Sequence, residues 1–226
     1  MRWVRVLVVA GPALVLAGLG LTHPQQLTAT SAPWWTTLHI VLLPIFPLLA
    51  VSLWLLLRGV PGPVAWMARI AAYGYATFYS VTDVVVGIAG GELTQFNAAR
   101  GLPERTVEVD RLIMVGNDVG EIGVWCFVVA CAATAVAVVV RVGRRALPGG
   151  VVLVIAGVLF TGGWHIYWPA GVVTMLVLAA GLGLLAVVLP DPQPRGRQAV
   201  EGKAGSPVPG VSLPAEGGRR PPAGQP

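Results

Sequence analysis

Long runs of apolar, uncharged residues constrain this chain more than any other feature. There are six such runs, and most approach the ~20 residues that a helix needs to cross the hydrocarbon core of a bilayer. Only 11% of the 226 residues are charged, whereas soluble domains average ~25%. A transmembrane β-barrel would instead show alternating strands of about ten residues. The sequence therefore predicts an all-α fold, a polytopic membrane helix bundle.

The predicted spanning helices follow the apolar runs. They cover Trp3–Leu21, Trp35–Leu57, Val64–Ile88, Leu112–Val140, Gly150–Trp164 and Ala170–Leu189. The fifth is shorter than ~20 residues, which makes the break before the sixth the least defined boundary. The first also fits a secretory signal peptide, but its length favours an uncleaved helix.

Arginine placement predicts the orientation of the bundle. Arg2, Arg5, Arg58 and the group Arg141, Arg144 and Arg145 lie at alternate ends of the runs, and cytoplasmic loops carry such an excess. We therefore expect both termini in the cytoplasm of a multi-pass protein of the plasma (inner) membrane. The arginine-, alanine- and glycine-rich composition suggests a bacterial genome rich in GC.

The domain organisation follows from a change in composition near residue 190. Residues 1–190 hold all six apolar runs and are predicted to form one transmembrane domain. Residues 191–226 are rich in proline and glycine and lack the large apolar residues that a core needs. They are predicted to be a disordered cytoplasmic tail.

The stretch Val115–Gly123 places two carboxylates and an amide inside a predicted spanning helix. A charged side chain at the bilayer centre costs ~2.5–3.5 kcal/mol on insertion scales, so such residues usually face the bundle interior. Together with Asp83 in the third run, these acids fall in the outer half of the membrane. No lysine or arginine lies at that depth. Protonation, a bound cation, histidinium or water would have to balance them.

The leading hypothesis is an outward-facing acidic pocket that binds a cation, a proton or a small polar ligand. Asp118 and Glu121 would form its floor, Asp83 and Tyr79 a wall, and His39 and His165 the rim. The predicted pocket residues are Asp83, Asn117, Asp118, Glu121, Tyr75 and Tyr79.

The alternative is an enzyme or redox protein that holds a metal or haem at the same place. Histidine nitrogen with carboxylate oxygen suits Zn²⁺ or a similar divalent ion. The candidate ligands are His39, His165, Asp83 and Asp118, with Glu121 as a general base. His39 and His165 could also form an axial pair for haem. His23 is interpreted as a loop residue, and no HExxH motif supports a metal site.

A third option is an accessory membrane subunit whose polar groups only specify helix packing. Gly116, Gly120 and Gly123 form a small-residue face suited to close packing, and such faces could also support a homo- or hetero-oligomer. The lipid bilayer is the expected partner. No motif suggests nucleic acid or a phosphate-binding loop, so whether the chain is an enzyme stays open.

Overall fold

The computed structural model describes residues 2–162 and 165–190. Within them the chain is helical and the predicted fold class, an all-α bundle, is confirmed. The helices are α1 (Arg2–Gly20), α2 (Ala32–Leu56), α3 (Pro63–Val81), η1 (Thr82–Ala89), α4 (Gly90–Ala99), α5 (Val107–Val142), η2 (Arg144–Ala146), α6 (Leu147–Leu159), η3 (Phe160–Gly162) and α7 (Ala170–Val188). Residues 191–226, the predicted tail, and Trp164, the predicted end of the fifth span, lie outside the described residues.

Five helical segments of the described chain are long and apolar enough to cross a membrane. They are Arg2–Gly20, Ala32–Leu56, Val107–Val142, Arg144–Gly162 and Ala170–Val188. The run predicted at Val64–Ile88 is also helical, as α3 and η1, but is not among these five. It packs between α2 and α5.

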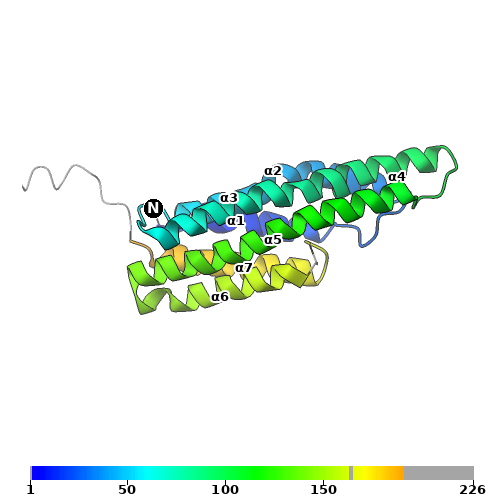
Figure 1. The fold of residues 1–226 in the computed structure, drawn as a ribbon. Coiled ribbons are helices and arrows are strands. Elements are labelled where there is room, and N and C mark those ends of the chain that lie inside the picture. Colours follow the sequence, from blue (N-terminus) through cyan, green and yellow to red (C-terminus); the bar gives the residue numbers. More distant parts are fainter. Residues whose placement is uncertain (1, 163–164, 191–226) are drawn as a thin grey trace, which may run out of the picture. The chain divides into compact units, whose positions relative to one another are not determined.

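The helices pack in a closed order. The helix α1 lies between α7 and α2, α3 contacts α2 and α5, and α6 joins α5 to α7. Leucine, phenylalanine and small residues from all of them fill the centre, with Phe46, Tyr75, Phe127 and Leu153 almost wholly buried. The segments α3, η1 and α4 form one helical rod beside α5, and the α4–α5 tip of this hairpin extends beyond α6 and α7 (Figure 1).

The two ends of the bundle differ in chemistry. At the end that we call the arginine end, arginine side chains satisfy carbonyls where helices stop: Arg5 bonds Ala186 O, Arg69 bonds Leu57 O and Arg141 bonds Gly59 O. Such carbonyls have no partner within their own helix, so a cation there is favourable. The opposite end, which we call the histidine end, carries His23, His39 and His165.

Exposed tryptophans mark two levels along the bundle. Trp3, Trp54 and Trp66 lie near the arginine end, while Trp34, Trp125 and Trp168 lie toward the histidine end, and all six are at least 44% exposed. Tryptophan is enriched where bilayer meets water. At 1.5 Å per residue, the ~30 Å hydrocarbon core counted from Arg141 ends near Glu121. The outer part of α5 therefore extends past the hydrocarbon.

The glycine face of α5 holds the hairpin together. A methyl group built on Gly123 would lie 2.5 Å from the backbone nitrogen of Tyr79, and one on Gly116 would lie 2.5 Å from Val86 Cγ2. On Gly120 it would overlap the hydroxyl of Thr82, which itself donates to Gly116 O at 3.2 Å. These glycines serve packing within the chain. An oligomer, which stays a prediction, would have to use other surfaces.

Gly123→Ala should destabilise the bundle, because the backbone of Tyr79 cannot move aside without separating α3 from α5. Overpacking of this kind costs about 1–3 kcal/mol. Heating the detergent-purified protein and measuring the folded fraction by size exclusion tests this. Gly18→Ala is the matched control, since nothing lies within 4 Å of its added methyl group, and alanine favours a helix. Equal melting of the two variants would contradict the role given to this face.

Candidate functional site

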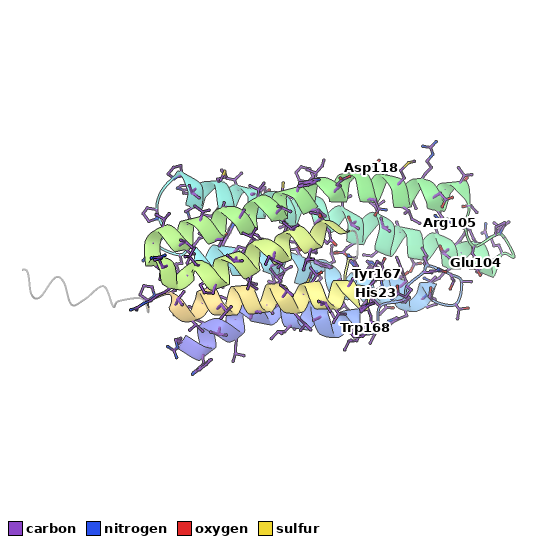
Figure 2. All side chains as sticks on the ribbon, turned by 90° about the horizontal axis from the view of Figure 1, so that it is seen from below. His23, Glu104, Arg105, Asp118, Tyr167 and Trp168 are labelled. Carbon is purple, nitrogen blue, oxygen red and sulfur yellow. The ribbon has the colours of Figure 1, made fainter. Side chains whose placement is uncertain are left out.

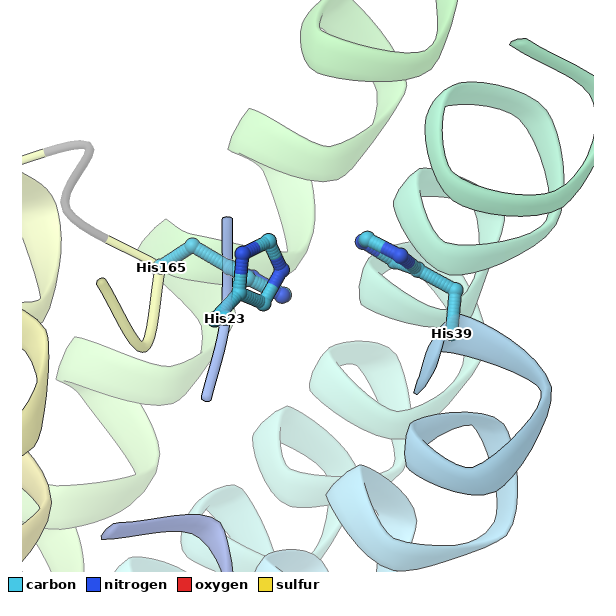
Figure 3. Close-up of side chains that lie close together, drawn as sticks. All are labelled: His23, His39 and His165. Atoms are coloured by element: carbon cyan, nitrogen blue, oxygen red, sulfur yellow. The ribbon is translucent and has the colours of Figure 1, made fainter. Parts of the chain in front are cut away.

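Three histidines from distant parts of the sequence meet at the histidine end. His23 follows α1, His39 lies in α2, and His165 lies between η3 and α7. One ring nitrogen of each lies within 4.8 Å of the others. The ring centroids are 5.1 Å apart for His23 and His39, 5.3 Å for His23 and His165, and 5.6 Å for His39 and His165. Figure 3 shows the three rings turned toward one space. These three residues are the histidine cluster.

Each ring is held by a hydrogen bond to its Nδ1. His23 Nδ1 lies 2.8 Å from Pro24 O, and His39 Nδ1 lies 2.8 Å from Trp35 O. A carbonyl only accepts, so both Nδ1 atoms must carry the proton, which leaves Nε2 with its lone pair. His165 Nδ1 lies 2.7 Å from the Tyr79 hydroxyl. The Nε2 atoms of His23 and His165 are buried with no hydrogen-bond partner among the described residues.

The two loop residues of the cluster, His23 and His165, are neutral at physiological pH. Burial is the main cause that lowers the pKa of His23 to about 4. The hydrogen bond to the Pro24 carbonyl raises this pKa, and the nearby His39 lowers it further. Burial, and then His39 and His23, lower the pKa of His165 well below its usual range. Unprotonated imidazole is the form that binds metals.

The helical rod α3–η1 forms one side of the cluster. Tyr79 contacts His165, and Gly87 lies so close to His39 that an added methyl group would overlap the imidazole ring. Asp83 is four residues from each, so it lies on the same face between them. It is fully buried, and neither carboxylate oxygen has a partner among the described residues. The π-helical turn η1 carries this face, and such turns are frequent at functional sites.

His165 adopts a positive φ of 47°. Left-handed backbone is uncommon for residues other than glycine, although asparagine, aspartate and histidine adopt it more often than the rest, and it costs of order 1–3 kcal/mol. Such strain persists where the surroundings fix the residue. Here the surroundings are the Tyr79 hydrogen bond and the stacked ring of His39.

A cavity of about 830 Å³ adjoins the cluster. Its buried end is formed by His39, Tyr79 and His165, with Trp35 and Tyr167 beside them. Its other end is formed by the exposed residues Gln25, Gln26, Glu104, Arg105, Asn117, Glu121, Trp125 and Thr161. The cavity therefore connects the cluster with the surface.

The predicted site residues do not all lie in the same cavity. Tyr79, Asn117 and Glu121 line the cavity, whereas Asp83 and Tyr75 are buried in the bundle and do not line it. Asp118 is exposed and lies well apart from His23 and Tyr167 (Figure 2). The prediction that Asp118 faces the interior is therefore wrong. It is two residues from both Gly116 and Gly120, which at 3.6 residues per turn is the opposite side of α5.

Of the predicted metal ligands, the structure brings His39 and His165 together, and Asp83 lies on the adjacent helix face. Asp118 is not near them. His23 was missed, because the sequence offers no pattern that folds the loop after α1 back over α2. One signal was available: all three histidines of the chain fall at the same predicted end of the bundle.

No protein-family model, curated protein or solved structure matches this chain. The fold and the apolar helices define an α-helical membrane protein. Anything finer has to be argued from the geometry of the histidine cluster.

Gly87→Ala should displace the His39 ring and loosen the cluster. Because the chain has only three histidines, modification by diethyl pyrocarbonate, followed by mass spectrometry on protein with a histidine-free tag, reports on the cluster directly. We expect slow modification of His39 in the unmodified chain and several-fold faster modification in the variant. Gly90→Ala is the control, since its methyl group would meet only ordinary contacts of 3.6 Å and beyond. Unchanged protection of His39 in Gly87→Ala would refute the contact.

Proposed function

We propose that the chain is a metal-dependent membrane enzyme of the plasma membrane, and that His23, His39 and His165 bind one divalent transition-metal ion through Nε2. The observation that carries this is the convergence of three imidazoles whose Nδ1 atoms are all engaged. Ligating histidines almost always use the second nitrogen in this way, which fixes ring orientation.

The distances suit a small ion after modest closure. Tetrahedral Zn²⁺ with Zn–N bonds of about 2.0–2.1 Å has its nitrogens about 3.3 Å apart, and the ring nitrogens here lie within 4.8 Å. Small rotations of the rings close that gap. Zn²⁺ is a good match for three neutral nitrogens, and the buried carboxyl of Asp83, on the adjacent helix face, has no partner among the described residues.

The open side of the cluster favours catalysis over a structural role. Structural zinc sites have four protein ligands, while catalytic ones have three and keep a position for water or substrate. The cavity adjoins His39 and His165, with Tyr79 and Tyr167 in its wall, which supports the second case. A Zn²⁺ ion with three imidazole ligands supplies Lewis-acid chemistry, so hydrolysis is the reaction class that it suits best.

The same geometry disfavours haem. A porphyrin occupies the whole plane between two axial imidazoles. The ring of His23 lies 5.1 Å from that of His39 and 5.3 Å from that of His165, and Tyr167 lies 4.5 Å from His23. These rings occupy the space that the macrocycle would need. A single ion fits between them.

Purified protein should contain about one Zn²⁺ per chain, as a three-histidine site predicts, and His23→Ala, His39→Ala and His165→Ala should each lose it. Inductively coupled plasma mass spectrometry, without chelator during purification, measures this. Asp118→Asn should keep its metal, because that side chain points away from the cluster. Metal retained in His23→Ala and His165→Ala, or bound only adventitiously by the unmodified chain, would rule out the proposal.

Tyr79→Phe should weaken metal binding 10–100-fold, the usual cost of losing a partner to a ligating histidine. The phenyl ring keeps the packing, so the fold should survive. Competition with a chromophoric chelator gives the affinity. Tyr73→Phe, an exposed tyrosine of the same helix, is the matched control. Equal affinities in the two variants would show that Tyr79 does not orient His165.

A further inference from the structure

The cavity beside the histidine cluster opens toward the level of the lipid headgroups. Its exposed wall is a stripe of α5 that contains Asn117, Glu121 and Trp125, with Thr161 opposite. By helix length, Glu121 lies near the end of the hydrocarbon core, and exposed tryptophans occur at this level. The cavity is therefore accessible from the membrane interface as well as from water.

The short sixth helix leaves this stripe uncovered. Helix α5 runs to Val142 with α6 packed beside it, but α6 ends at Leu159, and Phe160 and Thr161 then contribute to the cavity. Trp125, which lines the cavity, is 56% exposed, and the apolar residues Val129 and Val158 of the same two helices, α5 and α6, are 43% and 54% exposed. An amphipathic molecule could lie with its chain along these residues and its head in the cavity.

The polar lining selects against an anionic head. Its amide side chains are Gln25, Gln26 and Asn117, its hydroxyl groups belong to Tyr79, Thr82, Thr161 and Tyr167, and its acids are Glu104 and Glu121. Arg105 is the one arginine or lysine among the lining residues, and it bonds Asp110 at 2.5 Å. Phosphate recognition relies on cations free to bind it, Arg above all. Amides instead hydrogen-bond hydroxyl, ester and amide groups.

We propose that the ligand of this cavity is an uncharged membrane lipid with hydroxyl, ester or amide groups, such as a diacylglycerol, which enters from the membrane side of α5. This rests on the proposed function, because His39 and His165 of the histidine cluster form the buried end of the cavity. The carbonyl of the lipid would reach the cluster, and its chains would stay along α5 in the bilayer.

A photoactivatable diacylglycerol in detergent micelles, with the zinc-loaded full chain, tests the proposal. We expect labelling of the peptide that spans residues 113–125, competed by unlabelled diacylglycerol and not by phosphatidylglycerol. The double variant Asn117→Leu/Glu121→Leu should reduce labelling about tenfold, as expected for one or two lost hydrogen bonds. Asp118→Asn, at a residue that does not line the cavity, should label normally.

Metal content and melting temperature are measured on the same samples, which separates the two proposals. If zinc is present but labelling at residues 113–125 is not competed by diacylglycerol, the lipid proposal alone is overturned. The same holds if phosphatidylglycerol competes as well. Zinc absent with labelling intact overturns the metal-dependent function and leaves the lipid site. If the double variant has a lowered melting temperature, Asn117→Ala takes its place. If Asn117→Ala is then labelled as strongly as Asp118→Asn, the lipid proposal is wrong.

Discussion

The arrangement of the histidine end depends on the contact between the glycine face of α5 and the rod α3–η1. With no side chain at Gly116, Gly120 or Gly123, the two backbones approach closely, and the partly buried Thr82 hydroxyl donates a hydrogen bond across the contact. Close packing of this kind drives helix association in membranes, where there is no hydrophobic gain from it. The rod packs along this face of α5, and its residues Tyr79 and Gly87 contact His165 and His39.

How far the sequence predicts this arrangement depends on whether each feature is local. Apolar runs, arginine-rich ends and the spacing of the three glycines are local, so the helical class and the packing face could be predicted. The side on which Asp118 lies also follows from local spacing, since it is two residues from both Gly116 and Gly120, but the expectation that a charge in an apolar run faces the interior gave the wrong side. In the structure α5 is one helix from Val107 to Val142. Its polar first part lies beyond the core, where an exposed acid costs little.

The position of His23 could not be predicted from the sequence. Its position depends on α1 packing against α7 and on the loop at 22–31 returning over α2, which are contacts between distant parts of the chain. Periodicity carries no information about such contacts. Asp83 was found from sequence because a buried acid in an apolar run is anomalous on its own. Without a donor among the described residues, such a carboxylate either takes up a proton or is balanced by a cation. An ion held by the neighbouring neutral imidazoles would provide the second solution.

The packing below the cluster favours an ion that stays bound at the cluster over one that is transported across the bundle. An ion that crossed the bundle would need polar groups or water along its path toward the arginine end. Below His165 the interior is instead filled by aromatic rings in contact: the ring centroids lie 4.9 Å apart for Phe46 and His165, 5.1 Å for Tyr79 and Phe160, and 4.6 Å for Phe127 and Tyr75. Phe46 and Phe127 are essentially unexposed. Passage would require these rings to separate. The cluster is therefore better suited to hold an ion at the interface, open to the cavity on one side and closed by the aromatic core on the other.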